Sequence, residues 1–300
     1  MKKVDYLERT KRNHFFIGGE RGQKEIQSLK IGVAGLGGMG SNIAEYLARL
    51  GVGWLNLADP DTIDVSNINR QVIANSKTVG MSKAQASHDE LLRIAPDIDL
   101  QVFDQGITQD SVEEFVAGCD FIVDEIDVFP LEAHEILHRE CRKQKVPVYS
   151  AYVVGLGVHF YKFEGDEFTF EDFISGYNEM DENEKFNLIV ESFLGEAPCY
   201  LGEKELESFK QESLQRGVPI FGPSCLVGHS IVVSRILCDF LGGKVLGHKI
   251  PKTPSMPEYL KIDFTSMQLE VRNCLKDREF QDGESEQHQV HKKIVHKQPA

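Results

Sequence analysis

The sequence predicts an α/β protein with a Rossmann-like, mostly parallel sheet, helices on both of its faces and antiparallel strands at its C-terminal end. Short apolar runs alternate with helical segments at the spacing of β-α-β units, which is typical of a parallel sheet. A glycine-rich turn, GLGGMG, follows the first apolar run. Residues 258–264 and 266–271 form two adjacent runs of strand composition, which predicts a closing hairpin.

The elements of the parallel part follow from this alternation. The helix after the glycine turn is expected to end at Gly51, a typical C-cap, and the next helix to stop before Pro96. Pro130 suits the first position of a helix that runs to about residue 145. The expected strands are 30–37, 53–61, 99–105, 119–127, 146–154 and 157–163, and the expected helices are 38–51, 83–94, 109–117, 130–145 and 225–243.

The chain divides into three expected segments. Residues 1–29 form a polar N-terminal arm, residues 30–271 a single nucleotide-binding domain, and residues 272–300 a polar, disordered tail. Within the domain, residues 164–217 interrupt the β-α alternation as an acidic crossover insertion. Residues 164–212 contain 15 acidic residues against 3 lysines, most of the net charge of −14. Such a segment repels phosphate backbones, so nucleic acid is an unfavoured partner, and a solvated segment without a partner is the simplest interpretation.

Composition also indicates the compartment. The six cysteines are scattered without a C-x-x-C pair, which favours reduced cytosolic thiols over disulfides or a cysteine-rich zinc site. No run of about 18 apolar residues predicts a membrane span, and the charged start of the chain does not resemble a secretory signal. We therefore expect a cytoplasmic protein.

The glycine turn predicts a nucleotide site. Gly35, Gly37 and Gly40 fit the pattern G-x-G-x-x-G between a strand and a helix, and Gly38 adds a fourth glycine. Glycines allow close approach of a phosphate, and the helix N-terminus offers N–H donors. Asp59 ends the next strand, where a carboxylate can bind ribose. The alternative is a tight turn with a purely structural role.

The stretch SNINRQ, at 66–71, distinguishes between two nucleotides. A dinucleotide needs few cations beyond the loop, whereas cleavage of a triphosphate needs Arg or Lys groups and a metal. Arg70 and Lys83 can supply the cations, and Asp127, at the end of the fourth strand, can hold Mg²⁺. The alternative is a surface Arg, a surface Lys and a helix-capping Asp.

Together these motifs resemble the ThiF/MoeB/HesA family, relatives of ubiquitin-activating enzymes. The resemblance covers roughly 10–270 and includes R-x-x-R in the arm, the glycine loop with DPD, VSNINRQ, VGMSKAQA, IVDEID and GVPIFGPSCLVGHSIVVSRIL. It implies an ATP- and Mg²⁺-dependent adenylyltransferase that converts a carboxylate into an acyl-adenylate. The substrate would be the C-terminus of a ubiquitin-like or sulfur-carrier protein, or a peptide.

The resemblance also implies residue roles. Asp59 would bind ribose, and Asp127 would bind Mg²⁺. Arg12 would act across the interface of a homodimer, in the neighbouring subunit's site. Beyond these, the motif residues expected at the nucleotide and its phosphates are Gly35, Gly37, Gly38, Gly40, Asp61, Asn67, Arg70, Gln71 and Lys83.

Two features depart from the family pattern. Many bacterial members carry two C-x-x-C pairs for zinc, and their absence leads us to expect no structural zinc. The slot that often holds a reactive cysteine, 212–217, has none. Cys199 is the only cysteine of the insertion, and its acidic surroundings favour an inert thiol over a thioester-forming one.

A second motif, H-E-x-x-H, covers His134 to His138 and matches a zinc-protease pattern. No third ligand follows at the usual spacing, so we expect a helix surface rather than a metal site. Histidines in the polar tail, at His288, His291 and His296, could bind metal only adventitiously.

Three other functions remain open. The glycine loop alone would suit an NAD-dependent oxidoreductase. The stretch VDEIDVFPLEAHEI is similar to the tRNA-dehydratase branch of the family, which activates an RNA-bound or small-molecule carboxylate. A catalytically inactive partner subunit is the third, although it would not need the complete set of Arg12, Arg70, Lys83 and Asp127.

Overall fold

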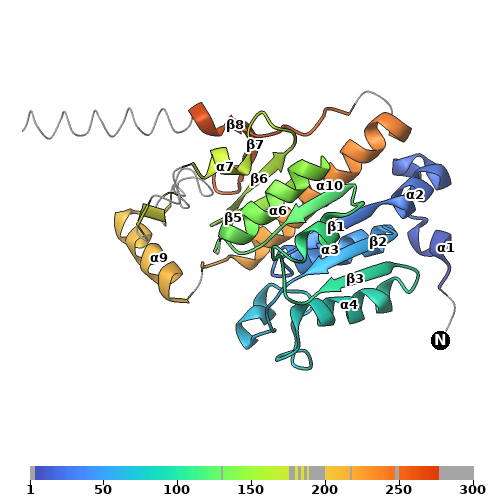
Figure 1. Ribbon diagram of the computed structural model, residues 1–300, viewed down its shortest axis with the longest axis horizontal. Helices are drawn as coiled ribbons and strands as arrows, with labels where there is room; N and C mark the ends of the chain where they lie inside the picture. The colour runs from blue at the N-terminus through green and yellow to red at the C-terminus, as the bar shows by residue number, and fades with distance from the viewer. Residues whose placement is uncertain are drawn as a thin grey trace, which may run out of the picture.

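A computed structural model describes residues 4–129, 131–175, 180–181, 184–185, 188, 200–216, 218–246 and 250–276 of the 300-residue chain. An eight-stranded sheet forms its centre, in the order β3-β2-β1-β4-β5-β6-β7-β8 (Figure 1). The strands are β1 (Lys30–Ala34), β2 (Trp54–Ala58), β3 (Asp99–Phe103), β4 (Phe121–Asp124), β5 (Val148–Val154), β6 (Gly157–Phe163), β7 (Glu258–Asp263) and β8 (Gln268–Asn273).

The sheet has a parallel and an antiparallel part. Strands β3, β2, β1, β4 and β5 pair in parallel, while β5–β6, β6–β7 and β7–β8 pair antiparallel. Apolar side chains fill the central strands because both faces are covered, as parallel sheets require. The predicted fold class, including the closing hairpin, is confirmed.

Helices cover both faces of the sheet (Figure 1). One face carries α2 (Gly19–Ser28), α3 (Gly40–Leu50), α4 (Lys83–Ile94) and α10 (Gly222–Leu241), and the other carries α5 (Val112–Val116), α6 (Leu131–Gln144) and α7 (Phe170–Phe173). Gly51 ends α3 in the left-handed conformation, as predicted.

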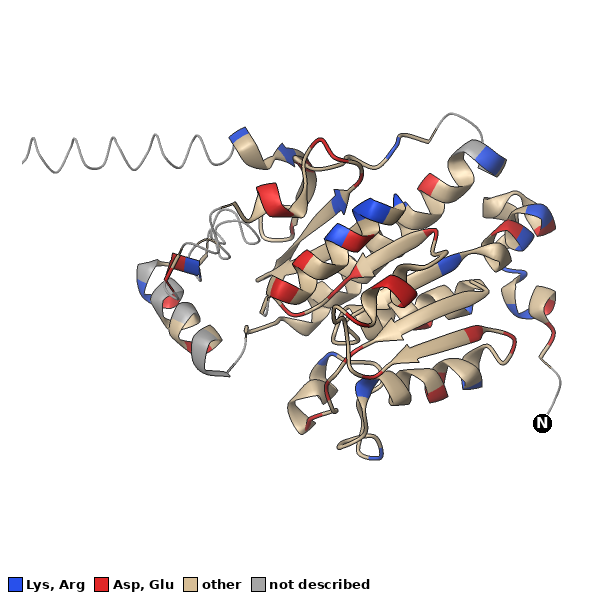
Figure 2. Cartoon of the chain, viewed as in Figure 1, with Lys and Arg blue, Asp and Glu red and all other residues tan. Residues whose placement is uncertain are grey.

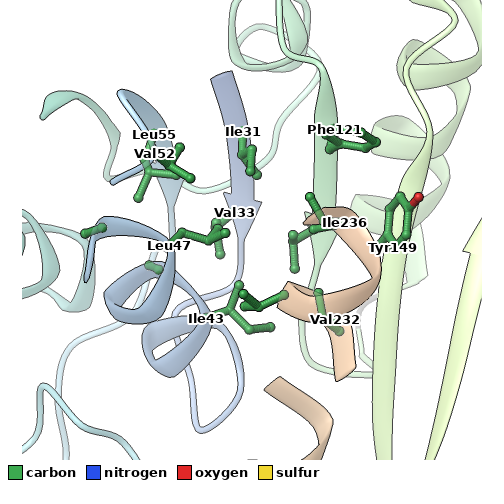
Figure 3. Close-up of a cluster of buried hydrophobic side chains, with 14 of the residues drawn as sticks. Ile31, Val33, Ile43, Leu47, Val52, Leu55, Phe121, Tyr149, Val232 and Ile236 are labelled. Carbon is green, nitrogen blue, oxygen red and sulfur yellow. The ribbon is translucent and has the colours of Figure 1, made fainter. Parts of the chain in front are cut away.

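Each face has its own apolar core. Figure 3 shows part of the larger one, where Ile43 and Leu47 of α3 face Ile31 and Val33 of β1, and Val232 and Ile236 of α10 lie beside them. The second core packs α5, α6 and α7 against the other face. Lys, Arg, Asp and Glu gather on the helices and connecting segments, and the strands between them are mostly uncharged (Figure 2).

Helix α10 has the length and the mean hydropathy, 1.5, of a membrane span. Its N-terminal Gly222–Pro223 pair follows the preference for Pro in the first helical turn. Half of the apolar stretch is buried inside the protein, against β5, β6 and α3, so its composition is explained by core packing.

The arm and the acidic segment are also partly ordered. The arm forms α1 (Tyr6–Thr10), a 3-10 turn (His14–Ile17) and α2, whose Ile26 is fully buried in the larger core. The predicted insertion begins with α7 and ends with α9 (Glu203–Arg216). Cys199 and residues 277–300, with the tail histidines, lie outside the described residues. The last strand, β8, ends at Asn273, two residues beyond the predicted domain boundary.

Candidate active site

The predicted site residues follow three neighbouring strands. Because β2, β1 and β4 pair in parallel, the segments that leave their carboxyl ends lie at one edge of the sheet. These segments contain the glycine loop after β1, Asp59 and Asp61 after β2, and Asp127 after β4. The fold therefore brings together residues that are up to 92 positions apart in the sequence, from Gly35 to Asp127.

The loop needs glycine at different positions for different physical reasons. Gly35 has φ of +84°, and a Cβ there would lie 2.1 Å from the backbone oxygen of Glu125. A Cβ on Gly40 would lie 1.8 Å from the backbone oxygen of Gly35, so this glycine closes the turn. A Cβ on Gly37, in contrast, would have only one described atom within 4 Å, Gln71 Nε2 at 3.9 Å. The described part of the chain therefore does not require glycine at 37, whereas a closely bound ligand would.

Asp59 is buried and already holds the loop. Its Oδ2 accepts a hydrogen bond from the Leu36 N–H at 2.7 Å, and its Oδ1 accepts one from the Asp61 N–H at 2.9 Å. Burial raises the pKa of Asp59, although the Lys83 charge opposes the shift. Lys83 Nζ lies 2.8 Å from Asp61 Oδ2 and 3.9 Å from Asp59 Oδ1. Asp59, which is expected to bind the ribose, and Lys83, which is expected to bind a phosphate, thus form one cluster with Asp61.

The SNINRQ stretch forms the turn Val65–Asn69 and continues across the glycine loop. Asn67 Oδ1 accepts from the Asp64 N–H at 3.1 Å, so this asparagine stabilises its own turn in a capping box. Asn42 Nδ2 donates to the backbone oxygens of both Gly38 and Arg70. The segment is therefore fixed directly to the loop, a structural role that the motif alone did not predict.

Two polar atoms beside the loop have no hydrogen-bond partner among the residues that the structure describes. These are Arg70 Nε and Gln71 Oε1, both buried. The Arg70 side chain lies over Gly38, where a Cβ would come within 3.0 Å of its Cγ. Gln23 Oε1, Ser87 Oγ and His229 Nδ1 are also unsatisfied, so such atoms do not by themselves define a site. Buried polar groups are almost always hydrogen-bonded, and a donor and an acceptor left open on adjacent residues beside the glycine loop suit a polar ligand there. A phosphate and ribose would satisfy them, and the predicted nucleotide fits these residues.

Asp127 lies beside a cavity at the same edge. The cavity has a volume of about 100 Å³ and is lined by both glycine-loop and Asp127-loop residues, by Tyr152 and Val153 of β5, and by Phe209 of α9. Asp127 is exposed, and an accessible carboxylate next to a phosphate site fits the needs of Mg²⁺, which takes one or two carboxylates with phosphate oxygens. Cys225 also lines this cavity; it is buried, and burial raises the pKa of its thiol to about 11.

Glu125 is a cavity residue that sequence reasoning missed. Its Oε1 accepts from the Ala151 N–H at 3.0 Å. Burial raises its pKa well above the usual value. A signal existed, since Glu125 directly follows Asp124, the last residue of a buried strand, and precedes Asp127 by two positions.

The prediction that H-E-x-x-H lies on a helix surface is wrong. His134 is fully buried and His138 is 4% exposed, and both rings contact one oxygen of Asp124, also fully buried. His134 Nδ1 lies 2.7 Å and His138 Nε2 2.9 Å from Asp124 Oδ2. Both rings stack on Phe170 of α7. The helix buries this face because the histidines occupy the same stripe as Leu137 and Cys141.

The three buried groups shift one another's protonation. Burial alone would raise the pKa of Asp124, but His134 and His138 hold it below its usual value. Burial alone would lower the pKa of His134, but the Asp124 charge outweighs it and the pKa is raised. For His138 burial prevails and the pKa is lowered. The shifts therefore favour an ionised Asp124 beside a protonated His134 and a neutral His138.

Arg12 is not at this edge of its own chain. Tyr6 Oη donates to the backbone oxygen of Gly51, and Arg9 forms an ion pair with Asp97. Gly51 and Asp97 precede β2 and β3, so they lie at the amino edge of the sheet. Strand β1 alone, with five residues, separates the two edges by roughly 16 Å. The structure therefore leaves Arg12 exposed and apart from the glycine loop.

Comparisons with known proteins concern the sequence and the fold of the chain. A model of the ThiF family matches residues 10–283. The chain is 33% identical to the SAMP-activating enzyme E1 of Haloferax volcanii over 151 residues. This aligned region covers 50% of this chain and 53% of that protein. It is 34% identical over 146 residues to a tRNA threonylcarbamoyladenosine dehydratase of Bacillus subtilis, covering 48% of this chain and 56% of that protein. The chain thus spans about half the length of these curated relatives.

Solved structures share the fold. Escherichia coli MccB with ATP has a TM-score of 0.64 at 19% identity, over 91% of this chain and 72% of that one. PaaA has a TM-score of 0.62 at 19% identity, over 91% of this chain and 76% of that one. At this identity the likeness concerns the fold alone. The family model, however, extends over most of the chain and confirms the resemblance in its motifs: the chain belongs to the ThiF family.

Proposed function

We propose that this protein is an ATP- and Mg²⁺-dependent adenylyltransferase that activates a carboxylate as an acyl-adenylate. The observation that carries the proposal is the pair of buried atoms Arg70 Nε and Gln71 Oε1, which are unsatisfied among the described residues. They lie beside Gly37, where no described residue comes closer than 3.9 Å to a built Cβ. MccB, which has been solved with ATP, shares the fold, and relatives include an E. coli protein named sulfur carrier protein ThiS adenylyltransferase.

The chemistry assigned to the site is one displacement at the α-phosphate. A substrate carboxylate oxygen forms a bond to phosphorus, the bond to the bridging oxygen breaks, and pyrophosphate leaves with its electron pair. Arg70 and Lys83 stabilise the negative charge that develops on the phosphates. Asp127 would hold Mg²⁺, which when bound neutralises phosphate charge. Freed from Asp61, the Lys83 ammonium can turn to a phosphate.

The cavity beside Asp127 suits the carboxylate substrate. Its walls are mainly apolar, and α9 of the predicted insertion contributes Phe209 and Ser213. Its volume of about 100 Å³ admits a slender group rather than a bulky one. We therefore favour the C-terminus of a ubiquitin-like or sulfur-carrier protein, or of a peptide, as the substrate.

Calorimetric titration with MgATP and NAD⁺ tests the nucleotide. We expect ATP to bind more tightly and its binding to depend on Mg²⁺. Tighter binding of NAD⁺ without a response to Mg²⁺ would contradict the proposal and favour an oxidoreductase. ATP–pyrophosphate exchange then tests the carboxylate, with carrier proteins ending in Gly-Gly and peptides as candidate substrates. Exchange that depends only on a modified tRNA would instead support the dehydratase alternative, which the Bacillus subtilis relative favours.

We further propose a homodimer in which Arg12 acts in the partner's site. Phe15 and Phe16, three and four positions after Arg12 in the sequence, are 89% and 77% exposed, which is costly for a free surface and expected of an interface. Mixing Arg12→Ala with Lys83→Ala should restore activity, because a mixed dimer has one site with both lesions and one with neither. With equal amounts and free exchange, about a quarter of wild-type activity is expected. No recovery despite exchange shown by mass spectrometry would contradict the proposal.

A further inference from the structure

The buried His134 ring joins the interior of the protein to the loop that carries Asp127. Its Nδ1 lies 2.7 Å from Asp124 Oδ2, and its Nε2 lies 3.0 Å from the backbone oxygen of Asp127. Both partners are acceptors, so both ring nitrogens of His134 donate. Asp124 is the last residue of β4, and the Ser150 hydroxyl donates to its backbone oxygen at 2.6 Å. The ring is thus fixed to the sheet at one end and holds the loop at the other.

The rest of the surroundings immobilises this ring. His134 stacks on Phe170 with ring centroids 5.5 Å apart and an interplanar angle of 18°. Phe170 belongs to α7, which is fastened to α6 by a two-pronged ion pair between Arg142 and Glu171, at 2.9 and 3.0 Å. A ring that is fully buried, stacked and bonded at both nitrogens cannot turn, so it can set the position of Asp127 rather than follow it.

His138 provides a natural comparison within the same cluster. Its Nε2 binds the same Asp124 oxygen at 2.9 Å, and its ring stacks on the same Phe170 at 4.4 Å. It lies one turn further along α6, where its ring also contacts Phe163, and no hydrogen bond joins it to residue 127 within the described part of the chain. The two histidines therefore share burial, partner and stacking, and they differ in the hydrogen bond to residue 127.

A metal ion would be the other way to join these three side chains. Ligand atoms around a zinc ion at metal–ligand distances of about 2.0–2.1 Å lie more than 3 Å apart in a tetrahedron. The separations here, 2.7 and 2.9 Å, are instead those of hydrogen bonds to a carboxylate. The distances therefore indicate hydrogen bonds, rather than a metal ion, between Asp124 and the two histidines.

We propose that His134, oriented by Asp124, is a positioning residue for the metal-binding carboxylate of Asp127. The proposal rests on the proposed function, in which Asp127 holds the Mg²⁺ of MgATP. By fixing the backbone at 127, the ring keeps the carboxylate directed at the phosphate site before the nucleotide binds. Partners of metal ligands act in this way in other proteins, and their loss typically weakens metal affinity about 10- to 100-fold.

The test measures how strongly Mg²⁺ assists ATP binding. The dissociation constant of ATP is determined by calorimetry in EDTA and in saturating Mg²⁺, and their ratio gives the assistance. We expect His134→Gln to reduce this ratio by about 10- to 100-fold, and the matched control His138→Gln to keep the wild-type ratio although both variants lose thermal stability. In an Asp127→Asn background, His134→Gln should have no further effect, because it acts through Asp127.

The possible failures are distinct. A wild-type ratio in His134→Gln, alongside a reduced ratio in Asp127→Asn, overturns the inference but leaves the proposed function intact. An equal reduction in both histidine variants also overturns it, since it would reflect general destabilisation. An unchanged ratio in Asp127→Asn overturns the metal role of Asp127 and the inference with it.

Two measurements on the wild-type protein do not depend on how well the variants fold. Ring ¹⁵N spectra should show a proton on both nitrogens of His134, and a bare ring nitrogen would overturn the hydrogen-bonded arrangement. Elemental analysis should find no zinc that depends on His134 and His138. One zinc per chain, lost in both histidine variants, would replace the hydrogen-bonded arrangement by a metal site.

Discussion

The glycine at position 37 allows the nucleotide site to be tested separately from the fold. Among the described residues, a Cβ at Gly37 would have one neighbour within 4 Å, Gln71 Nε2 at 3.9 Å, and the backbone there does not have a positive φ. Gly37→Ala should therefore fold with a free energy of unfolding within about 1 kcal/mol of wild type, and any change can be favourable because alanine restricts the unfolded chain. The same methyl group would occupy the space where a phosphate approaches the loop.

The expected loss of affinity follows from the contacts at stake. Keeping a phosphate oxygen from one backbone N–H removes a hydrogen bond to a charged group, worth about 1.5–3 kcal/mol. Calorimetry should thus show MgATP binding weakened by about 10- to 100-fold. Gly40→Ala is the matched control for the fold: its Cβ would lie 1.8 Å from the Gly35 oxygen, so this variant should lose stability itself. A folded Gly37→Ala protein that binds MgATP as tightly as wild type would refute a phosphate site at this loop.

Three further predictions follow. Arg70→Ala and Lys83→Ala should each lose about 2.7–4 kcal/mol of transition-state stabilisation, measured as slower ATP–pyrophosphate exchange. Wild-type exchange rates in both variants would show that neither residue takes part in catalysis. Burial lowers the pKa of His229, so the unfolded chain binds its proton first as pH falls below about 6.5. Urea unfolding should show that wild type loses stability between about pH 6.5 and the folded pKa, relative to His229→Asn; parallel pH profiles would contradict this. EDTA should leave the melting temperature unchanged, and a drop accompanied by released zinc would disprove the expectation of no structural zinc.

The nucleotide half of the fold was predictable because its signals are local. A strand, a glycine turn and a helix follow one another within 30–51, and parallel pairing then brings the ends of β2 and β4 to the same edge. The positions of Asp59 and Asp127 follow from that rule alone. The contact between Asn42 and the backbone of Arg70 does not, since it depends on how a turn of irregular structure folds over the loop.

The buried cluster could not be located by the same rule. Whether His134 faces solvent or the sheet depends on the rotation of α6 about its axis, and H-E-x-x-H contains no information about that. A partial signal was present: His134 and His138 share a helical stripe with Leu131, Leu137 and Cys141, all of them buried. That stripe indicates burial, but the partner, Asp124, lies on a strand, so the ion pair itself needed the tertiary structure.

The energetic cost of this cluster bears on its purpose. Removing a carboxylate and an imidazolium from water costs several kcal/mol per ion, and apolar residues of similar volume often serve stability as well or better. If these positions, which are at most 4% exposed, served only to pack α6 against the sheet, Asp124, His134 and His138 would add little stability over apolar side chains. Apolar side chains, however, could not donate a hydrogen bond to the backbone of Asp127. The cost of the buried charges is thus explained by the loop that they hold, at the edge of the sheet where the nucleotide and its metal are expected to bind.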